Sequence, residues 1–322
     1  MPHKLFALLA AWIGLAASLA AQTNLYVAAD GSAPYKSVPA AIMAVPAGTR
    51  ENPVVIHIAP GIYRGLIYIQ REKRFFKLVG GNPTNTILSY QLYAGITNAE
   101  GLPIGTFKTP STTIDADDFT AENLTFENAA GPVGQALAIR VDGDRAAFRH
   151  CRFLGWQDTM LLNRGRQYFE RCYICGHVDF IFGAATAWFE QCQIHALRDG
   201  YLTAASTPVD VPYGFVFSHC QVTAAPGVKT QLGRPWRDYA STCYLNCELS
   251  GAVLPSGWND WNKPATHATV RYAEFNSTGP GANPTNRPAW TTQLTEAQAR
   301  KVTVETVLGG ADGWNPTGAS MP

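Results

Sequence analysis

The sequence predicts an all-β protein built as a single parallel β-helix, a solenoid of stacked coils with short helical caps at its N- and C-terminal ends. A short strand pattern recurs every 20 to 28 residues with no helical segment between recurrences. The hairpin turns at 8–12-residue spacing that mark a β-sandwich are missing. A coil of this kind cannot bury its own apolar face, so successive coils have to stack. The 29 glycines and 21 prolines among 322 residues suit a chain with many turns.

The N-terminus has the pattern of a secretory signal peptide. Lys4 supplies a short positive start, residues 5–17 are almost wholly apolar, and residues 18–20 supply the small side chains of a cleavage site. We therefore expect a signal peptide over residues 1–21 and one domain over residues 22–322, in a secreted or periplasmic protein with no membrane attachment. The apolar run is shorter than the ~20 residues of a membrane span. The alternative is a buried N-terminal helix.

The repeated unit is an aromatic residue, two further residues, Cys or Asn, one residue and an apolar residue. Residues 148–153 show it clearly around Cys151, and residues 121–126 fit the frame with Asn123 in place of cysteine. Period-2 alternation predicts a short strand after a turn in each unit. Stacked strands lie ~4.8 Å apart, so residues one coil apart become lateral neighbours. The later units are centred on Cys172, Cys192, Cys220 and Cys247.

Two helical segments are expected at the ends of the solenoid. Residues 35–45 look helical despite Pro39 and could cover its N-terminal end. Residues 295–298 form a capping box, Thr-Glu-Ala-Gln, that opens a C-terminal helix to about Val307. Residues 276–288 are expected to form a surface loop, and no interdomain linker is evident.

Seven cysteines are an odd number, so at least one thiol is expected to be free. Coil spacing puts neighbouring Cα atoms ~5 Å apart, inside the range for a disulfide. A bridge between Cys172 and Cys192 is the candidate, with Cys151 competing for Cys172. The alternative is a ladder of buried thiols packed as small apolar groups. We expect no metal at Cys172-x-x-Cys175-x-His177, because alternation points these side chains in different directions.

Two aspartates recur at the coil spacing. Asp158 and Asp179 are 21 residues apart, as are Cys151 and Cys172, so the solenoid should place the two carboxylates side by side. Adjacent carboxylates resist joint ionisation, which gives one base or nucleophile and one acid. Arg234 could hold one of them ionised through its two-pronged guanidinium. The alternative is a structural Asp–Arg pair in a turn of the solenoid.

Two glutamines have the same spacing as the coils. Gln135 lies 22 residues before Gln157, and their amides could form an oxyanion hole, or both could be ordinary surface residues. Neither a G-x-S-x-G nucleophile elbow nor a glycine-rich phosphate loop is present. The balance of 25 basic and 24 acidic residues lacks the basic excess of a nucleic-acid-binding protein.

Several strings, in the same order along the chain, resemble the pectin methylesterases, carbohydrate esterases with a right-handed parallel β-helix. The resemblance covers roughly residues 25–316. It rests on residues 117–128, 134–136, 143–148, 155–159, 178–183, 200–204, 232–236, 257–258, 261–262 and 272–282.

The resemblance implies a role for each candidate residue. It implies that Asp179 is the nucleophile, Asp158 the acid and then the base, and Arg234 the group that orients and ionises Asp179. Gln135 and Gln157 are implied as oxyanion donors. The implied substrate is methyl-esterified homogalacturonan, bound by a monomer without metal or organic cofactor. The implied substrate-binding residues are Ser111 (usually Thr in the family), Gln135, Phe182, Tyr201, Arg234 and Trp236.

The sequence departs from the family pattern at two positions. Gly65 stands where the family usually has a non-catalytic Glu, and Leu161 stands where it often has Tyr. Loss of that polar aromatic keeps open an esterase with the same site acting on a different ester or thioester. A non-catalytic glycan-binding solenoid is a third interpretation. A polysaccharide lyase would need a calcium site of clustered acids, which the sequence does not show.

Overall fold

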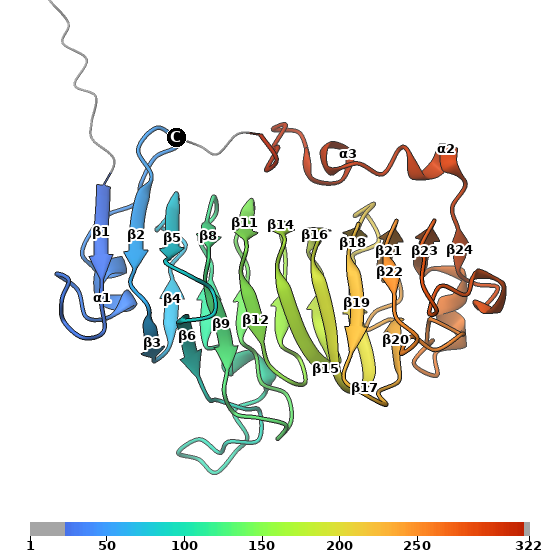
Figure 1. Ribbon diagram of the computed structural model, residues 1–322, viewed down its shortest axis with the longest axis horizontal. Helices are drawn as coiled ribbons and strands as arrows, with labels where there is room; N and C mark the ends of the chain where they lie inside the picture. Colours follow the sequence, from blue (N-terminus) through green and yellow to red (C-terminus); the bar gives the residue numbers. More distant parts are fainter. Residues whose placement is uncertain (1–22, 319–322) are drawn as a thin grey trace, which may run out of the picture.

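Two parallel β-sheets run the length of the solenoid, and successive coils contribute strands to both (Figure 1). The structure, a computed structural model, describes residues 23–318. Within them the first sheet has eleven strands in the order β1 (Thr23–Val27), β2 (Val54–Ile58), β5 (Phe76–Gly80), β8 (Thr120–Glu122), β11 (Ala146–Arg149), β14 (Arg166–Glu170), β16 (Thr186–Glu190), β18 (Phe215–Ser218), β21 (Ser241–Leu245), β23 (Arg271–Phe275) and β24 (Thr292–Gln293).

The second sheet contains two rows of strands that merge where β15 and β17 each pass through both rows. The β12 and β13 strands, which belong to different rows, both pair with β15. The all-β prediction is confirmed, with every strand ladder parallel. The strands of this sheet are β3 (Gly61–Arg64), β4 (Ile67–Ile69), β6 (Thr86–Tyr90), β7 (Thr112–Ile114), β9 (Thr125–Asn128), β10 (Ile139–Val141), β12 (Arg152–Leu154), β13 (Met160–Leu162), β15 (Tyr173–Gly183), β17 (Gln193–Ala205), β19 (Gln221–Ala224), β20 (Thr230–Gly233) and β22 (Glu248–Leu249).

The predicted register of the repeat is confirmed from Cys151 onward. In the upstream unit, the position equivalent to cysteine lies one residue after the predicted Asn123. Ala121 pairs with Phe148 and Phe126 with Phe153, so Leu124 occupies the cysteine position. Asn123 instead falls at the sharp turn between the sheets, where one residue per coil has a left-handed backbone with φ between 49° and 56°. These residues are Asn123, His150, Arg171, Gln191, His219, Asn246 and Asn276.

One aromatic ring per coil stacks on the next inside the solenoid. The ring centroids of Phe148 and Phe169 lie 4.9 Å apart, and those of Phe169 and Phe189 lie 4.8 Å apart. The stack continues through Phe217 to Tyr244 at 4.4 and 4.5 Å. Such offset ring pairs add stabilisation beyond burial of their area. This ladder explains why the repeat begins with an aromatic residue.

Five of the cysteines, Cys151, Cys172, Cys192, Cys220 and Cys247, form a ladder of thiols, and the predicted Cys172–Cys192 disulfide is wrong. All seven cysteines are free. The Cys172 thiol donates to the carbonyl of Phe148 at 3.6 Å, and the Cys192 thiol donates to that of Phe169 at 3.5 Å. In-register parallel strands hold equivalent side chains about one strand spacing apart and pointing the same way. The ~2 Å bond of a disulfide would require the two side chains to turn toward each other.

The helices are shorter than predicted. The N-terminal helix α1 (Val38–Met43) has Ser37 as its N-cap and Pro39 in its first turn, and it contacts β1, β2 and β4. The expected C-terminal helix is two short ones, α2 (Glu296–Ala299) and α3 (Val304–Leu308), because Thr303 opens a second capping box. The chain also forms 3₁₀ turns over Thr106–Lys108, Pro264–Ala268 and Pro284–Asn286.

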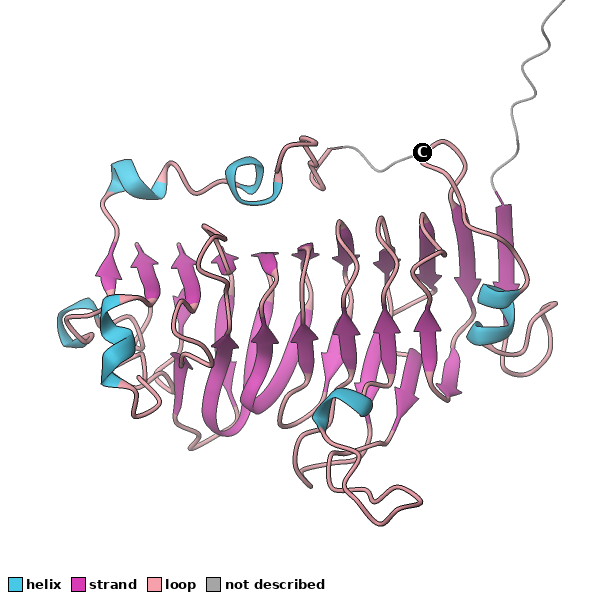
Figure 2. Ribbon diagram, turned by 180° about the vertical axis from the view of Figure 1, so that it is seen from behind, coloured by secondary structure: helices cyan, strands magenta, loops and turns pink. Residues whose placement is uncertain are grey.

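The C-terminal segment runs back along the first sheet rather than covering the end of the solenoid (Figure 2). Helix α3 contacts β16, and Val307 and Leu308 pack into a cluster on the outer face of this sheet. The predicted signal peptide lies outside the described residues. Across residues 23–318, every helix is too short or too polar to span a bilayer.

Candidate active site

A cleft of about 310 Å³ opens on the second sheet and brings together all five predicted catalytic residues. Gln135 and Gln157 form an isolated parallel bridge, one coil apart as their spacing predicts. Apart from Thr106, the other lining residues are apolar or aromatic. The residues lining the cleft are Thr106, Phe107, Gln135, Gln157, Asp158, Asp179, Phe182, Ala204, Arg234, Trp236 and Trp261.

The two aspartates share an unusual backbone conformation. Asp158 has φ 63° and Asp179 has φ 53°, both left-handed. The Asp158 N–H donates to the carbonyl of Val178 at 3.1 Å, which fixes Asp158 against the segment that carries Asp179. Left-handed conformations of non-glycine residues cost energy and persist where surrounding contacts impose them. Here the stacked coils impose them on both carboxylates.

Arg234 binds Asp179 through both prongs of its guanidinium. Its Nε donates to Oδ1 at 2.8 Å and its Nη2 donates to Oδ2 at 2.7 Å. The guanidinium lies between two aromatic rings, 4.0 Å from the ring centroid of Tyr201 and 3.6 Å from that of Trp261. The bidentate geometry and the cation–π contacts leave the cation little freedom to leave the carboxylate.

The electrostatics separate the two carboxyl groups. Burial, together with the charge of Asp179, raises the pKa of Asp158 to about 8, and Arg234 opposes the rise. Burial also raises the pKa of Asp179 above its ordinary value, but there the hydrogen bonds and charge of Arg234 pull the pKa back down. Asp179 therefore ionises first. With its pKa of about 8, Asp158 is the carboxyl group that keeps its proton at neutral pH.

Aromatic rings form one wall of the cleft. The rings of Phe182 and Trp236 meet edge to face at 5.7 Å, and Phe107 approaches Trp236 at 6.5 Å. Leu161 does not line this wall: it is fully buried in a small cluster with Leu137, Phe182, Ala204 and neighbouring tryptophans. The residue that departs from the family pattern thus supports the cleft floor from beneath.

Two predicted substrate contacts, Ser111 and Tyr201, are not among the residues that line the cleft. Ser111 is 1% exposed, and its hydroxyl has no hydrogen-bond partner among the described residues. Burial of the hydroxyl under the sheet keeps it from a ligand in the cleft. Tyr201 is likewise not a lining residue, although its ring packs on the guanidinium of Arg234, which does line the cleft.

Sequence reasoning missed four lining residues: Thr106, Phe107, Ala204 and Trp261. The first two belong to a 3₁₀ turn in an irregular loop, which has no periodic signal. Trp261 belongs to one of the segments that resemble the family. Its contact with Arg234 depends on a left-handed backbone, which the sequence pattern does not predict. Within residues 23–318 no three His, Cys, Asp or Glu side chains are grouped closely enough to hold a metal ion.

The fold and its relatives place the protein among the carboxylic ester hydrolases. The chain belongs to the pectinesterase family, whose sequence model matches residues 24–311. It is 38% identical to Pectinesterase 31 of Arabidopsis thaliana, over 85% of this chain and 88% of that protein. It is 35% identical to Pectinesterase/pectinesterase inhibitor 3 of the same plant, over 89% of this chain but only half of that longer protein.

Solved structures agree with this assignment. A pectin methylesterase from carrot superimposes with a TM-score of 0.83 and 31% identity, over 90% of this chain and 94% of that one. A pectin methylesterase in complex with a hexasaccharide superimposes with a TM-score of 0.78 and 30% identity, over 92% of this chain and 99% of that one. The predicted fold class and family are confirmed.

Proposed function

We propose that the chain hydrolyses methyl esters of galacturonate units in pectin, releasing methanol, with Asp179 as nucleophile and Asp158 as acid and then base. The single observation that carries the residue assignment is the bidentate pair of Arg234 and Asp179 beside a carboxyl group that holds its proton at neutral pH. Membership of the pectinesterase family supplies the reaction class. The solved relative with a bound hexasaccharide supports a polysaccharide substrate.

In the first half-reaction, a carboxylate oxygen of Asp179 adds to the ester carbonyl carbon. The carbonyl electron pair moves to oxygen, and the side-chain amides of Gln135 and Gln157 donate to this oxyanion. When the tetrahedral intermediate collapses, the C–O bond to the methoxy group breaks and Asp158 donates its proton to that oxygen. Methanol leaves, and an anhydride links Asp179 to the sugar.

In the second half-reaction, Asp158 is an ionised base. It accepts a proton from a water molecule whose oxygen adds to the sugar carbonyl carbon. Collapse of this second tetrahedral intermediate breaks the bond to Asp179, which leaves as a carboxylate held by Arg234. Asp158 ends protonated and the product is the free galacturonic acid. Every proton and bond is accounted for without a metal.

The cleft suits a sugar polymer. Phe182, Trp236 and Phe107 offer ring faces and edges next to the carboxylates, and sugar rings pack well on aromatic surfaces. Leu161 is buried and offers no polar group to a ligand, so its departure from the family pattern leaves the proposed esterase chemistry unchanged. A different ester or thioester as the substrate is an outcome of the substrate test below. We further propose an exported monomer, with a signal peptide over residues 1–21 and the catalytic domain over residues 22–322.

The test is methanol release from highly methylated pectin in the presence of EDTA. We expect Asp179→Asn and Asp158→Asn to lose at least ~10³-fold in kcat, a loss in keeping with removal of a nucleophile or an acid. Asp210→Asn, which changes an exposed carboxylate that does not line the cleft, is the matched control and should keep full activity. A folded wild type that releases no methanol would exclude pectin, and a panel of other esters and thioesters would follow.

A further inference from the structure

A loop over residues 259–263 covers Arg234 on the side away from Tyr201. It carries Trp261, whose ring centroid lies 3.6 Å from the Arg234 guanidinium carbon. Trp261 and Asn262 are consecutive left-handed residues, with φ 56° and 54°. The Trp261 N–H donates to Oδ1 of Asn259 at 2.7 Å, and the Asn262 N–H donates to Oδ1 of Asp260 at 3.0 Å. The placement of the indole thus depends on a strained loop.

Lys263 joins this loop to the turn that carries Arg234. Its Nζ donates to the backbone carbonyls of Pro235 and Trp236, each at 3.2 Å. The same ammonium lies 4.8 Å from the ring centroid of Trp261. One cation therefore touches both segments that frame the guanidinium. The partners of the Lys263 ammonium are thus two backbone carbonyls and the face of an aromatic ring.

We propose that Lys263 is a positioning residue, whose ammonium fixes the 259–263 loop to the Arg234–Trp236 turn and so keeps the Trp261 indole on the guanidinium that holds Asp179. This inference rests on the proposed function, because Asp179 is the nucleophile there. Lys263 itself lines no part of the cleft and touches no reacting atom. It acts through Trp261 and the backbone of Pro235 and Trp236.

The physical argument concerns the freedom of Arg234. The rings of Tyr201 and Trp261 shield the guanidinium from water and restrict its rotation. Without Lys263, the left-handed loop can relax and lift the indole. Arg234 then gains hydration and rotational freedom, and its two hydrogen bonds to Asp179 weaken. A weaker ion pair makes ionised Asp179 less favourable, so the nucleophile forms only at higher pH.

The charged and titratable groups around Asp179 come from several elements. Arg234 follows β20, Asp158 precedes β13, His177 lies on β15 with Asp179, and Tyr272 lies on β23. Lys263 is not among the groups that act directly on Asp179. A change at Lys263 therefore reaches the nucleophile through Arg234. The other three groups are the same in a Lys263 variant and in the wild type.

The experiment compares Lys263→Met, Lys263→Arg and the exposed control Lys301→Met. Met keeps the aliphatic stem and removes the ammonium, whereas Arg restores a cation with several donors. For Lys263→Met we expect kcat/KM on methylated pectin to fall about tenfold and its acid limb to move up by about half a pH unit, both restored in large part by Lys263→Arg. Lys301→Met should match the wild type.

A substrate-free measurement completes the test. The carboxyl carbon of Asp179 is titrated by NMR in the wild type and in Lys263→Met, with Asp179→Asn for assignment. We expect its midpoint to rise in Lys263→Met. An unchanged midpoint and acid limb would overturn the proposal, even if activity fell through poorer folding. If the wild type released no methanol, the proposed function would fail, and the titration would still decide the role of Lys263.

Discussion

Asp158 and Asp179 occupy similar surroundings, and a single arginine gives their carboxyl groups different protonation states. Both are buried, both have a left-handed backbone, and both occupy equivalent positions one coil apart. Arg234 binds only Asp179. Burial raises the pKa of both carboxyl groups. The arginine assigns the negative charge to one of them, and that charge in turn holds the proton on the other.

This assignment predicts the pH dependence of kcat/KM. Activity requires ionised Asp179 and protonated Asp158. It should fall as pH rises through about 8, where Asp158 loses its proton, and on the acid side where Asp179 is protonated, above the ordinary range of an aspartate. Methanol release between pH 4 and 10 measures both limbs. Activity that kept rising past pH 9 would contradict Asp158 as the acid.

The same pKa predicts a stability effect of Asp158→Asn. Folding raises the pKa of Asp158 from 3.8 to about 8, so the folded state binds the proton more tightly than the unfolded state. The contribution of this proton to wild-type stability is complete below the unfolded pKa and is lost as pH rises through the folded pKa of about 8. The full loss is roughly 1.4 kcal/mol for each pH unit that separates the folded pKa from the unfolded one. Asparagine has no proton to lose. In thermal unfolding, the stability of Asp158→Asn relative to the wild type should therefore increase between pH 4 and pH 8. The same stability difference at both pH values would contradict this prediction.

At the scale of the element, the turn between the sheets depends on a single left-handed residue in each coil. Residues with a branched Cβ avoid this conformation, whereas Asn tolerates it. We expect His150→Val to lower the free energy of unfolding by about 1–2 kcal/mol and His150→Asn to leave it nearly unchanged. Urea denaturation measures both. Equal loss in the two variants would mean that the imidazole of His150 matters and the backbone conformation does not.

The sequence predicted those features that depend on coil length alone. The spacing of 21 residues placed Asp158 beside Asp179 and Cys151 beside Cys172, since one coil equals one step of the stack. Features that depend on side-chain direction were not predictable. Spacing brought Cys172 next to Cys192 but could not show that parallel thiols point the same way.

Irregular segments set the other limit. Trp261 reached Arg234 through a strained loop, and Phe107 through a 3₁₀ turn, neither of which has a periodic pattern. The C-terminal helix was predicted as continuous because Thr303, the second N-cap, resembles an ordinary helical residue until its hydrogen bond with Thr306 is seen. Local capping overrode the expected continuity.

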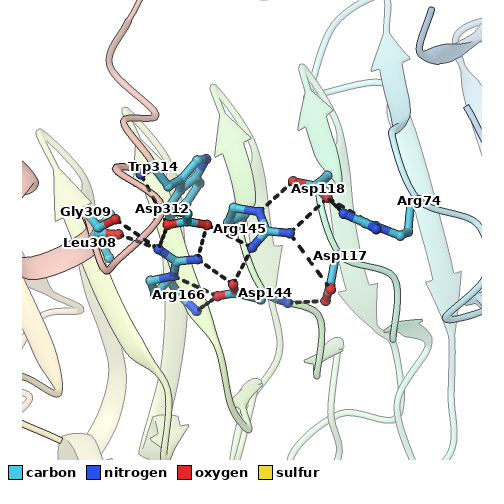
Figure 3. A network of polar contacts seen from close by, with 10 residues as sticks. All are labelled: Arg74, Asp117, Asp118, Asp144, Arg145, Arg166, Leu308, Gly309, Asp312 and Trp314. Carbon is cyan, nitrogen blue, oxygen red and sulfur yellow. Dashed lines mark hydrogen bonds and ion pairs between the residues drawn. The ribbon is translucent and has the colours of Figure 1, made fainter. Parts of the chain in front are cut away.

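On the scale of the whole molecule, the two sheets carry different tasks. The cleft lies on the second sheet, whereas the first sheet is the base to which the C-terminal segment is fastened. Figure 3 shows the polar part of that attachment. Asp312 pairs with Arg166 at 2.5 Å and with Arg145 at 3.1 Å. Arg145 continues to Asp118 at 2.6 Å, so alternating charges cross several coils.

The apolar part of the attachment should dominate its energy. Asp312 is 45% exposed on its side chain, and solvent screens such pairs. Leu308 is fully buried, in a cluster with Tyr168, Trp188 and Val216 on the outer face of the first sheet. Removal of a fully buried leucine side chain costs about 2–5 kcal/mol through lost burial and an unfilled cavity.

We therefore expect Leu308→Ala to destabilise the protein by about 2–4 kcal/mol, with kcat/KM at 25 °C unchanged because the cleft lies on the other sheet. Denaturant unfolding and methanol release measure the two quantities. Val209→Ala, at a 64% exposed side chain, is the control and should change stability by less than about 0.5 kcal/mol. Unchanged stability in Leu308→Ala would mean that the C-terminal segment unfolds separately from the solenoid. A fall in kcat/KM of the folded variant would mean that packing on the first sheet also positions the carboxylates.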